Sequence, residues 1–310
     1  MLEEPQRFSL VDAPVPSIGR GDVLVRVAAC GVCTSELDMW RGLAGHARYP
    51  WYAGHEVSGI VEAAGDRVGS FAPGDRVAVW VTERGYAEYV AVPAEHCFPA
   101  SGVAPELALG EPLACAVNIV QLADIALGDD VVIVGAGFMG LVVLELVQQR
   151  GPRHLIVADT RQDALERARK LGASHVVDVA NESLAGVVAD LTGSGAEVTF
   201  EMTGVQAALE SLGDVTKMSG TVVIGGYHQG EPRTIRLGEW NWMAFRIANA
   251  HFRDVATILR GMDQGMRLLT SGRISLDGLV THRFELNRID EAFATAVERP
   301  DGFVKATVIP

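Results

Sequence analysis

The sequence has 310 residues, of which 48% are hydrophobic and 21% are charged, so it is long enough for two globular domains that each bury a core. Its 26 basic and 39 acidic residues give a net charge of −13, which argues against partners such as nucleic acid or an anionic membrane. Four cysteines are too few for a disulfide framework and favour a reducing compartment. Since we also find no signal peptide and no long apolar run, we expect a cytoplasmic protein.

The first part of the chain, up to about residue 115, predicts a β-rich module. Short β-branched runs are separated there by Gly, Pro and Asp, and helical periodicity is nearly absent. The expected strands cover residues 22–30, 56–65, 75–81 and 87–93.

The pattern changes near residue 116, where continuous apolar strands begin to alternate with helices. This alternation predicts a parallel sheet that is covered by helices on both faces. The expected strands are 130–134, 154–159, 175–179, 197–204, 221–227 and 246–252, with helices at 138–151, 160–172 and 205–218. The tail adds expected helices at 253–270 and 287–298 and strands at 279–286 and 303–310.

A glycine motif stands between the first of these strands and its helix. Gly135, Gly137 and Gly140 form a G-x-G-x-x-G, with Phe138 and Met139 between the last two glycines. The first glycine permits a tight turn, the second lets the backbone approach a pyrophosphate, and the third allows close packing of helix on strand. The helix N-terminus favours the negative charge of the pyrophosphate, so we predict a dinucleotide site.

Asp159 ends the next strand, 19 residues after Gly140. A carboxylate accepts hydrogen bonds from a ribose 2′-hydroxyl and repels a 2′-phosphate, which favours NAD over NADP. Arg161 leaves NADP as the alternative, because a guanidinium can hold a 2′-phosphate.

Cys30 and Cys33 have the C-x-x-C spacing of a redox pair or of half a structural zinc site. The thioredoxin-like context of a redox pair is missing. Cys33, the pair His55-Glu56 and Glu111 precede the glycine motif in that order. This order resembles the zinc-dependent medium-chain dehydrogenase family, particularly its polyol, threonine and sorbitol dehydrogenase-like branch, and the resemblance extends over essentially the whole chain.

The resemblance implies an α/β protein with two domains. A GroES-like, β-rich catalytic domain would comprise residues 1–117 and 251–310, and a Rossmann domain with a doubly wound parallel sheet would comprise residues 118–250. The active site would lie in the cleft between them.

The resemblance also implies a single catalytic zinc ion. Cys33, His55 and Glu111 match the zinc ligands, and Glu56 matches a carboxylate that can also enter the coordination sphere. Cys115 could compete with Glu111 as third ligand, because residues four apart share a helical face. Three ligands leave a fourth position for the alcohol, which zinc would polarise for hydride transfer to the nicotinamide. Residues 74–90 contain no cysteine, so we predict that no structural zinc is bound.

Further residues have roles implied by the same resemblance. Ser35 matches a proton-relay hydroxyl, and Asp38 stands where the family has an outer histidine, which changes the expected pH behaviour. Glu36 is expected to pair with Lys305, which should also approach the pyrophosphate. Gly225 is assigned to the cofactor site.

The predicted function is therefore an NAD-dependent zinc alcohol dehydrogenase that acts on a secondary alcohol such as a polyol, cyclitol or sugar-like molecule. An NADPH-dependent aldehyde or ketone reductase of the same family, and a dinucleotide-binding module without turnover, are the alternatives. The family forms dimers and tetramers, so we expect a homodimer or homotetramer. The substrate stays open, because loops of unknown conformation line the pocket.

Overall fold

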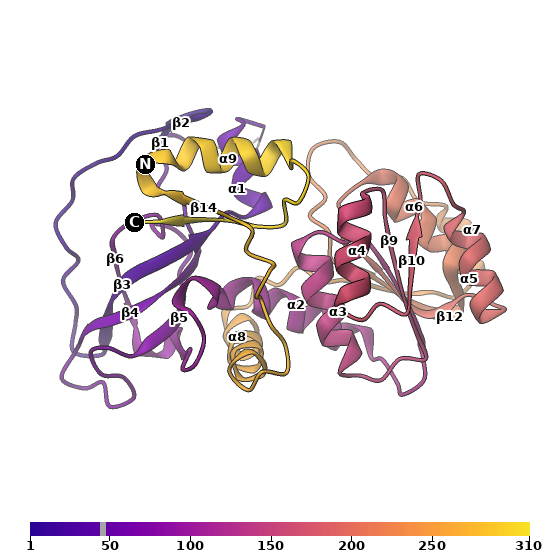
Figure 1. Cartoon of the computed structure of the whole chain (residues 1–310), viewed down its shortest axis with the longest axis horizontal. Coiled ribbons are helices and arrows are strands. Elements are labelled where there is room, and N and C mark those ends of the chain that lie inside the picture. Colours follow the sequence, from indigo (N-terminus) through magenta and orange to yellow (C-terminus); the bar gives the residue numbers. More distant parts are fainter. Residues whose placement is uncertain (44–47) are drawn as a thin grey trace. The chain divides into compact units, whose positions relative to one another are not determined.

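A computed structural model describes residues 1–43 and 48–310 of the chain. The chain folds into two compact units (Figure 1). The first unit comprises Met1–Ala114 and Asp254–Pro310, and the second comprises Cys115–Arg253. Helix α2 (Gly110–Ala123) begins in the first unit and ends in the second.

The first unit is built on a mostly antiparallel sheet. Its strands follow the order β14-β15-β3-β4-β5-β7, with β6 paired to β3, and only β14 and β15 run parallel to each other. Strand β15, near the end of the chain, lies between β14 and β3. The strands are β3 (Asp22–Gly31), β4 (Glu56–Ala64), β5 (Arg76–Trp80), β6 (Tyr89–Pro93), β7 (Cys97–Pro99), β14 (His282–Glu285) and β15 (Ala306–Ile309), with a separate pair of β1 (Leu2–Glu4) and β2 (Arg7–Phe8).

Two helices pack over one apolar cluster of the first unit. Leu37 and Trp40 of α1 (Thr34–Trp40) meet Phe293 of α9 (Ile289–Glu298) in this cluster. The Trp40 indole donates to Asp290 at 3.1 Å. Helix α1 was not expected from the sequence, because seven residues are too few to display a helical period. The unit also contains α8 (Val255–Thr270) and the short 3-10 helices Ala94–His96, Pro105–Leu107 and Leu286–Arg288.

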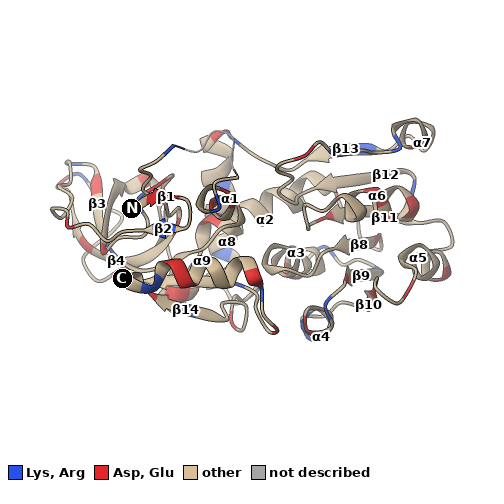
Figure 2. Cartoon of the chain, turned by 90° about the horizontal axis from the view of Figure 1, so that it is seen from above, with Lys and Arg blue, Asp and Glu red and all other residues tan. Residues whose placement is uncertain are grey.

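The second unit is built on a fully parallel sheet of six strands. Their order is β10-β9-β8-β11-β12-β13, and every neighbouring pair is parallel. In Figure 2, α3 and α4 lie on one side of β8, β9 and β10, and α5 lies on the other. The strands are β8 (Asp130–Val134), β9 (His154–Asp159), β10 (His175–Asp178), β11 (Ala196–Glu201), β12 (Thr216–Ile224) and β13 (Arg246–Asn249). The helices are α3 (Phe138–Gln148), α4 (Gln162–Lys170), α5 (Leu184–Thr192), α6 (Gln206–Val215) and α7 (Leu237–Trp242).

The strand order reverses between β8 and β11, and in doubly wound sheets the carboxyl ends of the strands at such a reversal are where ligands bind. All five residues of β8 are buried, as expected for a central strand. The expected helix 205–218 is too long. It ends at Val215, and the buried Thr216 begins β12 and hydrogen-bonds to Thr199 of the neighbouring strand at 2.8 Å.

One stretch, Pro105–Ala123, is long and apolar enough to cross a membrane by length and composition. However, 67% of it is buried inside the protein, which is typical of a core helix.

Candidate functional site

Three potential metal ligands converge in the first unit. One ligand atom each of Cys33, His55 and Glu56 lies within 4.8 Å of the others. Cys33 is the N-cap of α1, directly after β3, and Glu56 begins β4 opposite Gly31. Pairing of β3 with β4 therefore brings together residues that are far apart in the sequence.

A buried carboxylate fixes the orientation of His55. The Nδ1 atom of His55 lies 2.8 Å from Oε1 of Glu36. Burial acts to lower the pKa of His55, but the negative charges of Glu36 and Cys33 raise it well above its usual value. Since Nδ1 faces Glu36, the Nε2 atom is the ring nitrogen left to face Cys33. Metal-binding histidines are commonly oriented by a carboxylate in this way.

Glu36 itself is only 1% exposed and is held by three donors. Its carboxylate accepts hydrogen bonds from the backbone N–H of Gly54 at 2.8 Å and from the hydroxyl of Tyr86 at 2.6 Å, in addition to His55. Burial acts to raise the pKa of Glu36, but His55 and these hydrogen bonds outweigh it, so the net pKa is lowered and the group stays ionised. Tyr86 was missed by sequence reasoning, because nothing near it in the sequence signals this contact.

Lys305 pairs with Glu56, whereas the sequence analysis expected Glu36 as its partner. Its Nζ atom lies 2.7 Å and 2.6 Å from the two carboxylate oxygens of Glu56. The register of the strands explains this difference. Gly31 of β3 pairs with Glu56 of β4 on one side and with Thr307 of β15 on the other, which brings Lys305, just before β15, close to Glu56. Burial acts to lower the pKa of Lys305, but the charges of Glu56 and Cys33 raise it overall.

Gly31 is required for this ion pair. A Cβ atom at Gly31 would lie 2.0 Å from Oε2 of Glu56 and 3.1 Å from Cε of Lys305. Only glycine leaves room there for the two buried side chains.

Glu111 lies outside the close group of three ligand atoms within the described residues. It is half-buried in the first turn of α2, and its charge contributes to the raised pKa of Lys305, so its carboxylate lies near that amine. Cys115 follows one helical turn later and is also half-buried. The third zinc ligand therefore remains a prediction.

The relay residues lie on α1. The Ser35 hydroxyl donates to the sulfur of Cys33 at 3.3 Å. Asp38 lies one turn further along the same helix and is half-buried. Ser35 therefore lies directly beside the ligand cluster.

The other cysteines of the first unit lie in the apolar core. Cys30 and Cys97 are buried free thiols in the same cluster of strand residues. Burial raises the pKa of Cys97 to about 12 and that of Cys30 well above its usual value. Cys30 thus packs in the core and forms no disulfide with Cys33.

The donor set of the cluster fits zinc. Sulfur, imidazole nitrogen and carboxylate oxygen are the atoms that zinc prefers in proteins. The Oε2 atom of Glu56 accepts no hydrogen bond in the described part of the chain, although it contacts Lys305. The side chains of Cys33, His55 and Glu56 are thus of the types that bind a metal, and both oxygens of Glu56 lie beside the amine of Lys305.

The glycine loop of the second unit has the shape needed to hold a pyrophosphate. Gly135 has a φ of +111°, and its Cβ would lie 2.6 Å from Thr203. A Cβ at Gly140 would lie 1.9 Å from the carbonyl oxygen of Gly135, whereas one at Gly137 would meet no atom within 4 Å. The open space at Gly137, the N-cap of α3, is a cradle for a ligand. Phe138 is buried and Met139 half-buried behind it.

Asp159 lies next to this loop at the end of β9. Its carboxylate accepts from the backbone N–H of Ala136 at 2.7 Å and of Arg161 at 2.9 Å. The Arg161 side chain also contacts Asp159, at 3.4 Å. The acidic and the basic residue that bear on cofactor choice are therefore paired with each other.

Gly225 follows β12 at the same carboxyl edge of the sheet. Its N–H donates to the carbonyl of Glu201 at 2.9 Å, and a Cβ there would lie 2.8 Å from the sulfur of Met202. His251 lies near the same segment, with Nε2 3.0 Å from the carbonyl oxygen of Gly226.

Comparisons with known proteins find related sequences and structures. Residues 19–102 match the family described as "Alcohol dehydrogenase GroES-like domain", and residues 139–260 match "Zinc-binding dehydrogenase". Sorbitol dehydrogenase of Gallus gallus is 30% identical, over 92% of this chain and 89% of that protein. L-threonine 3-dehydrogenase of Pseudoalteromonas atlantica is 29% identical, over 95% and 94%. A zinc-binding dehydrogenase of Sinorhizobium meliloti 1021, solved with NADP, has a TM-score of 0.87 at 27% identity over 100% of this chain and 98% of that one. Together with the two sheets, these matches confirm the predicted fold class.

Proposed function

The chain belongs to the zinc-dependent medium-chain dehydrogenase family, and we propose that it is an NAD-dependent, single-zinc dehydrogenase of secondary alcohols. Its named relatives are oxidoreductases that act on alcohol CH–OH groups. The observation that carries this proposal is the convergence of Cys33, His55 and Glu56 within 4.8 Å. No structural zinc is part of the proposal, since residues 74–90 lack cysteine.

In this proposal Cys33, His55 and Glu111 hold the zinc ion, and Glu56 is the carboxylate that can replace one of them. Bound zinc supplies Lewis-acid polarisation of the alcohol oxygen, which lowers the pKa of the alcohol. Glu36 keeps the His55 ring oriented with Nε2 toward the ligand cluster.

The first unit also supplies the proton path. Ser35, 3.3 Å from the Cys33 sulfur, is the proposed relay: its hydroxyl accepts the proton that the alcohol loses and passes its own proton outward. Asp38, on the same helix, is the proposed outer acceptor. Lys305 holds the Glu56 carboxylate through their buried ion pair and is a proposed contact of the cofactor phosphates.

We propose NAD as the cofactor, which supplies the hydride acceptor. Asp159 presents a carboxylate at the end of β9, and Arg161 is paired with it. An arginine held in this way is less available for a 2′-phosphate, and the carboxylate repels that phosphate. The competing cofactor is NADP, with which the Sinorhizobium meliloti protein was solved.

The substrate class rests on the named relatives. Sorbitol is a polyol, and L-threonine carries a secondary hydroxyl, so a secondary alcohol with a neighbouring polar group is common to both. We propose a polyol, cyclitol or sugar-like substrate. The second candidate is an NADPH-dependent ketone reductase of the same family, which Arg161 and the NADP-bound neighbour favour.

The test combines zinc analysis with a screen of NAD and NADP reduction over polyols, cyclitols and amino alcohols. Wild-type protein and the control Cys97→Ala should retain one zinc ion per chain and activity, because Cys97 lies in the core away from the cluster. Cys33→Ser should lose both together. A Cys33→Ser variant with full zinc content and activity would refute the ligand assignment.

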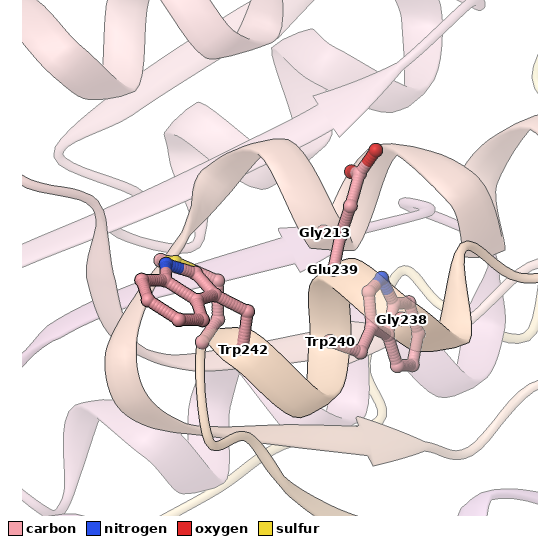
Figure 3. Close-up of a pocket in the computed structure, with 6 residues that line it drawn as sticks. Gly213, Gly238, Glu239, Trp240 and Trp242 are labelled. Atoms are coloured by element: carbon pink, nitrogen blue, oxygen red, sulfur yellow. The ribbon is translucent and has the colours of Figure 1, made fainter.

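We also propose a cytoplasmic homo-oligomer that forms through the edge strand β13. This strand ends the order of the parallel sheet, so one of its edges is unpaired within the described residues. Figure 3 shows the adjacent surface depression, where Trp240 and Trp242 of α7 lie with Gly213. Exposed apolar side chains gather near β13 and α7, namely Met218 (55% exposed), Leu237 (51%), Trp242 (81%) and Ile247 (43%).

A second copy can extend such a sheet and cover these side chains by two-fold symmetry. Trp242→Glu should shift the protein toward monomers in light scattering coupled to size exclusion. The matched control Leu127→Glu changes a residue that is 88% exposed in the same unit and should leave the mass unchanged. Equal masses for wild type and Trp242→Glu count against this interface.

A further inference from the structure

A buried carboxylate ends strand β11 in the second unit, and neither the zinc site nor the glycine loop uses it. Glu201 has 0% exposure. Its Oε1 atom accepts from the backbone N–H groups of Thr203 at 2.7 Å and Gly204 at 2.9 Å, and it also contacts the Thr203 hydroxyl. One oxygen of Glu201 therefore holds the turn that follows β11.

The second oxygen of Glu201 faces a histidine from the loop after β12. Oε2 lies 2.8 Å from Nε2 of His228, whose side chain is 15% exposed. The Nε–H of Arg233 donates to Nδ1 of His228 at 3.2 Å. With Nδ1 accepting from Arg233, Nε2 is the ring nitrogen that can donate a proton to Glu201.

Arg233 ties the same loop to the turn after β11. Its terminal nitrogens donate to the carbonyls of Gly204 at 3.2 Å, Gln229 at 3.1 Å and Glu231 at 2.8 Å. The loop can lie this close only because residue 226 is glycine. A Cβ at Gly226 would be 2.1 Å from Oε2 of Glu201 and 2.4 Å from the nitrogen of Gly204.

The turn held by Glu201 also contacts the glycine loop. The Thr203 side chain is the nearest neighbour of the Cβ position at Gly135, at 2.6 Å, and the N–H of Met202 donates to the carbonyl of Val134 at 2.8 Å. A continuous set of contacts therefore runs from the phosphate-binding loop through Thr203 and Glu201 to His228.

The place of these residues decides which half of the cofactor they serve. In a doubly wound sheet each half binds one nucleotide, and the glycine loop and Asp159 take the pyrophosphate and the adenosine ribose. The carboxyl ends of β11 and β12 belong to the other half, which takes the nicotinamide nucleotide.

We propose that Glu201, His228 and Arg233 are positioning residues that hold loop 225–236 as a wall for the nicotinamide. The inference rests on the proposed binding of a nicotinamide dinucleotide. It predicts that the network supports binding of the nicotinamide half and leaves the adenosine half unaffected.

The test compares the affinities of NADH and of ADP-ribose, which lacks the nicotinamide. His228→Asn removes the contact with the Glu201 carboxylate, and Arg233→Ala removes the hydrogen bonds of the guanidinium to His228 and to three carbonyls. Each variant should weaken NADH binding about tenfold and change ADP-ribose binding less than twofold. They should also diminish the fluorescence change of bound NADH. His228→Gln should recover most of the affinity, because the glutamine amide can place an N–H near the original Nε2 position. The control His175→Ala, on edge strand β10, should match wild type in both titrations.

The inference would be overturned if the variants lost affinity for NADH and for ADP-ribose to the same extent, or for neither. It would also be overturned if His228→Asn and His228→Gln bound NADH equally well. If the His228 variants do not fold, Arg233→Ala carries the test, since its side chain lies at the outer end of the network. Wild-type protein that binds neither ligand would refute both this inference and the proposed cofactor. Wild type that binds both ligands but oxidises no alcohol would refute the proposed reaction alone.

Discussion

The clearest test of the zinc-site geometry is removal of the charge on Glu36. The Glu36 carboxylate accepts from Gly54 at 2.8 Å, His55 at 2.8 Å and Tyr86 at 2.6 Å, and among the expected zinc ligands His55 is the one that these hydrogen bonds reach. Glu36→Gln keeps the size of the side chain and one acceptor oxygen. The Tyr86 hydroxyl can rotate to accept from the new amide, so the hydrogen bonds are weakened more than broken.

The expected magnitude follows from these contacts. Loss of a carboxylate that orients a metal-binding histidine typically lowers metal affinity by 10–100-fold, or about 1.4–2.8 kcal/mol. We expect a loss of this size for Glu36→Gln, with a loss of unfolding free energy of at most about 2 kcal/mol. Glu36→Ala should lower stability further, by about 1–3 kcal/mol, because the buried N–H of Gly54 then has no acceptor.

Zinc affinity is measured by competition with a chromophoric chelator, and stability by denaturant unfolding with and without zinc. The matched control is Tyr86→Phe, which removes the hydroxyl that contacts Glu36 at 2.6 Å and the carbonyl of Gly31 at 3.0 Å. It leaves the charge of Glu36 and should change zinc affinity less than about threefold. If Glu36→Gln binds zinc as tightly as wild type, or no more weakly than Tyr86→Phe, then Glu36 does not act on the metal through His55.

Two further predictions concern the second unit. Gly140→Ala should lower the melting temperature of this unit and abolish NADH binding, because its Cβ would lie 1.9 Å from a carbonyl oxygen. Gly137→Ala should keep the melting temperature but weaken NADH binding, because its Cβ would occupy the open space where the cofactor is expected. Equal melting temperatures for the two variants would contradict this account. Asp159→Ala should raise the ratio of NADP to NAD turnover, because it removes the repulsion of the 2′-phosphate and frees Arg161; an unchanged ratio in steady-state kinetics would refute the cofactor assignment.

Much of the second unit could be predicted from the sequence because its central strands, such as β8, are buried on both faces. β8 shows this best, as an unbroken apolar run that leads into the glycine loop. The end of α6 was misplaced because Thr216, a buried strand residue, pairs with Thr199, which the local sequence does not show. The family resemblance inferred from the ordered motifs is confirmed by the matches.

The partners inside the zinc site were harder to predict. Residues adjacent in sequence, His55 and Glu56, reach the same ligand cluster but contact different partners, Glu36 and Lys305, which the local sequence does not show. The contact of Tyr86 with Glu36 depends on how a loop returns to the sheet. No periodicity encodes such a contact, so only the folded structure reveals it.

The position of β15 has a consequence for how the protein is made. This strand completes the first sheet by pairing with β3, and Lys305, just before it, reaches Glu56, 249 residues earlier in the chain. A nascent chain therefore has all of Cys115–Arg253 outside the ribosome before the sheet can close. We expect the parallel sheet to form first during synthesis, and the metal-binding half to become competent only after Lys305 and β15 have been synthesised.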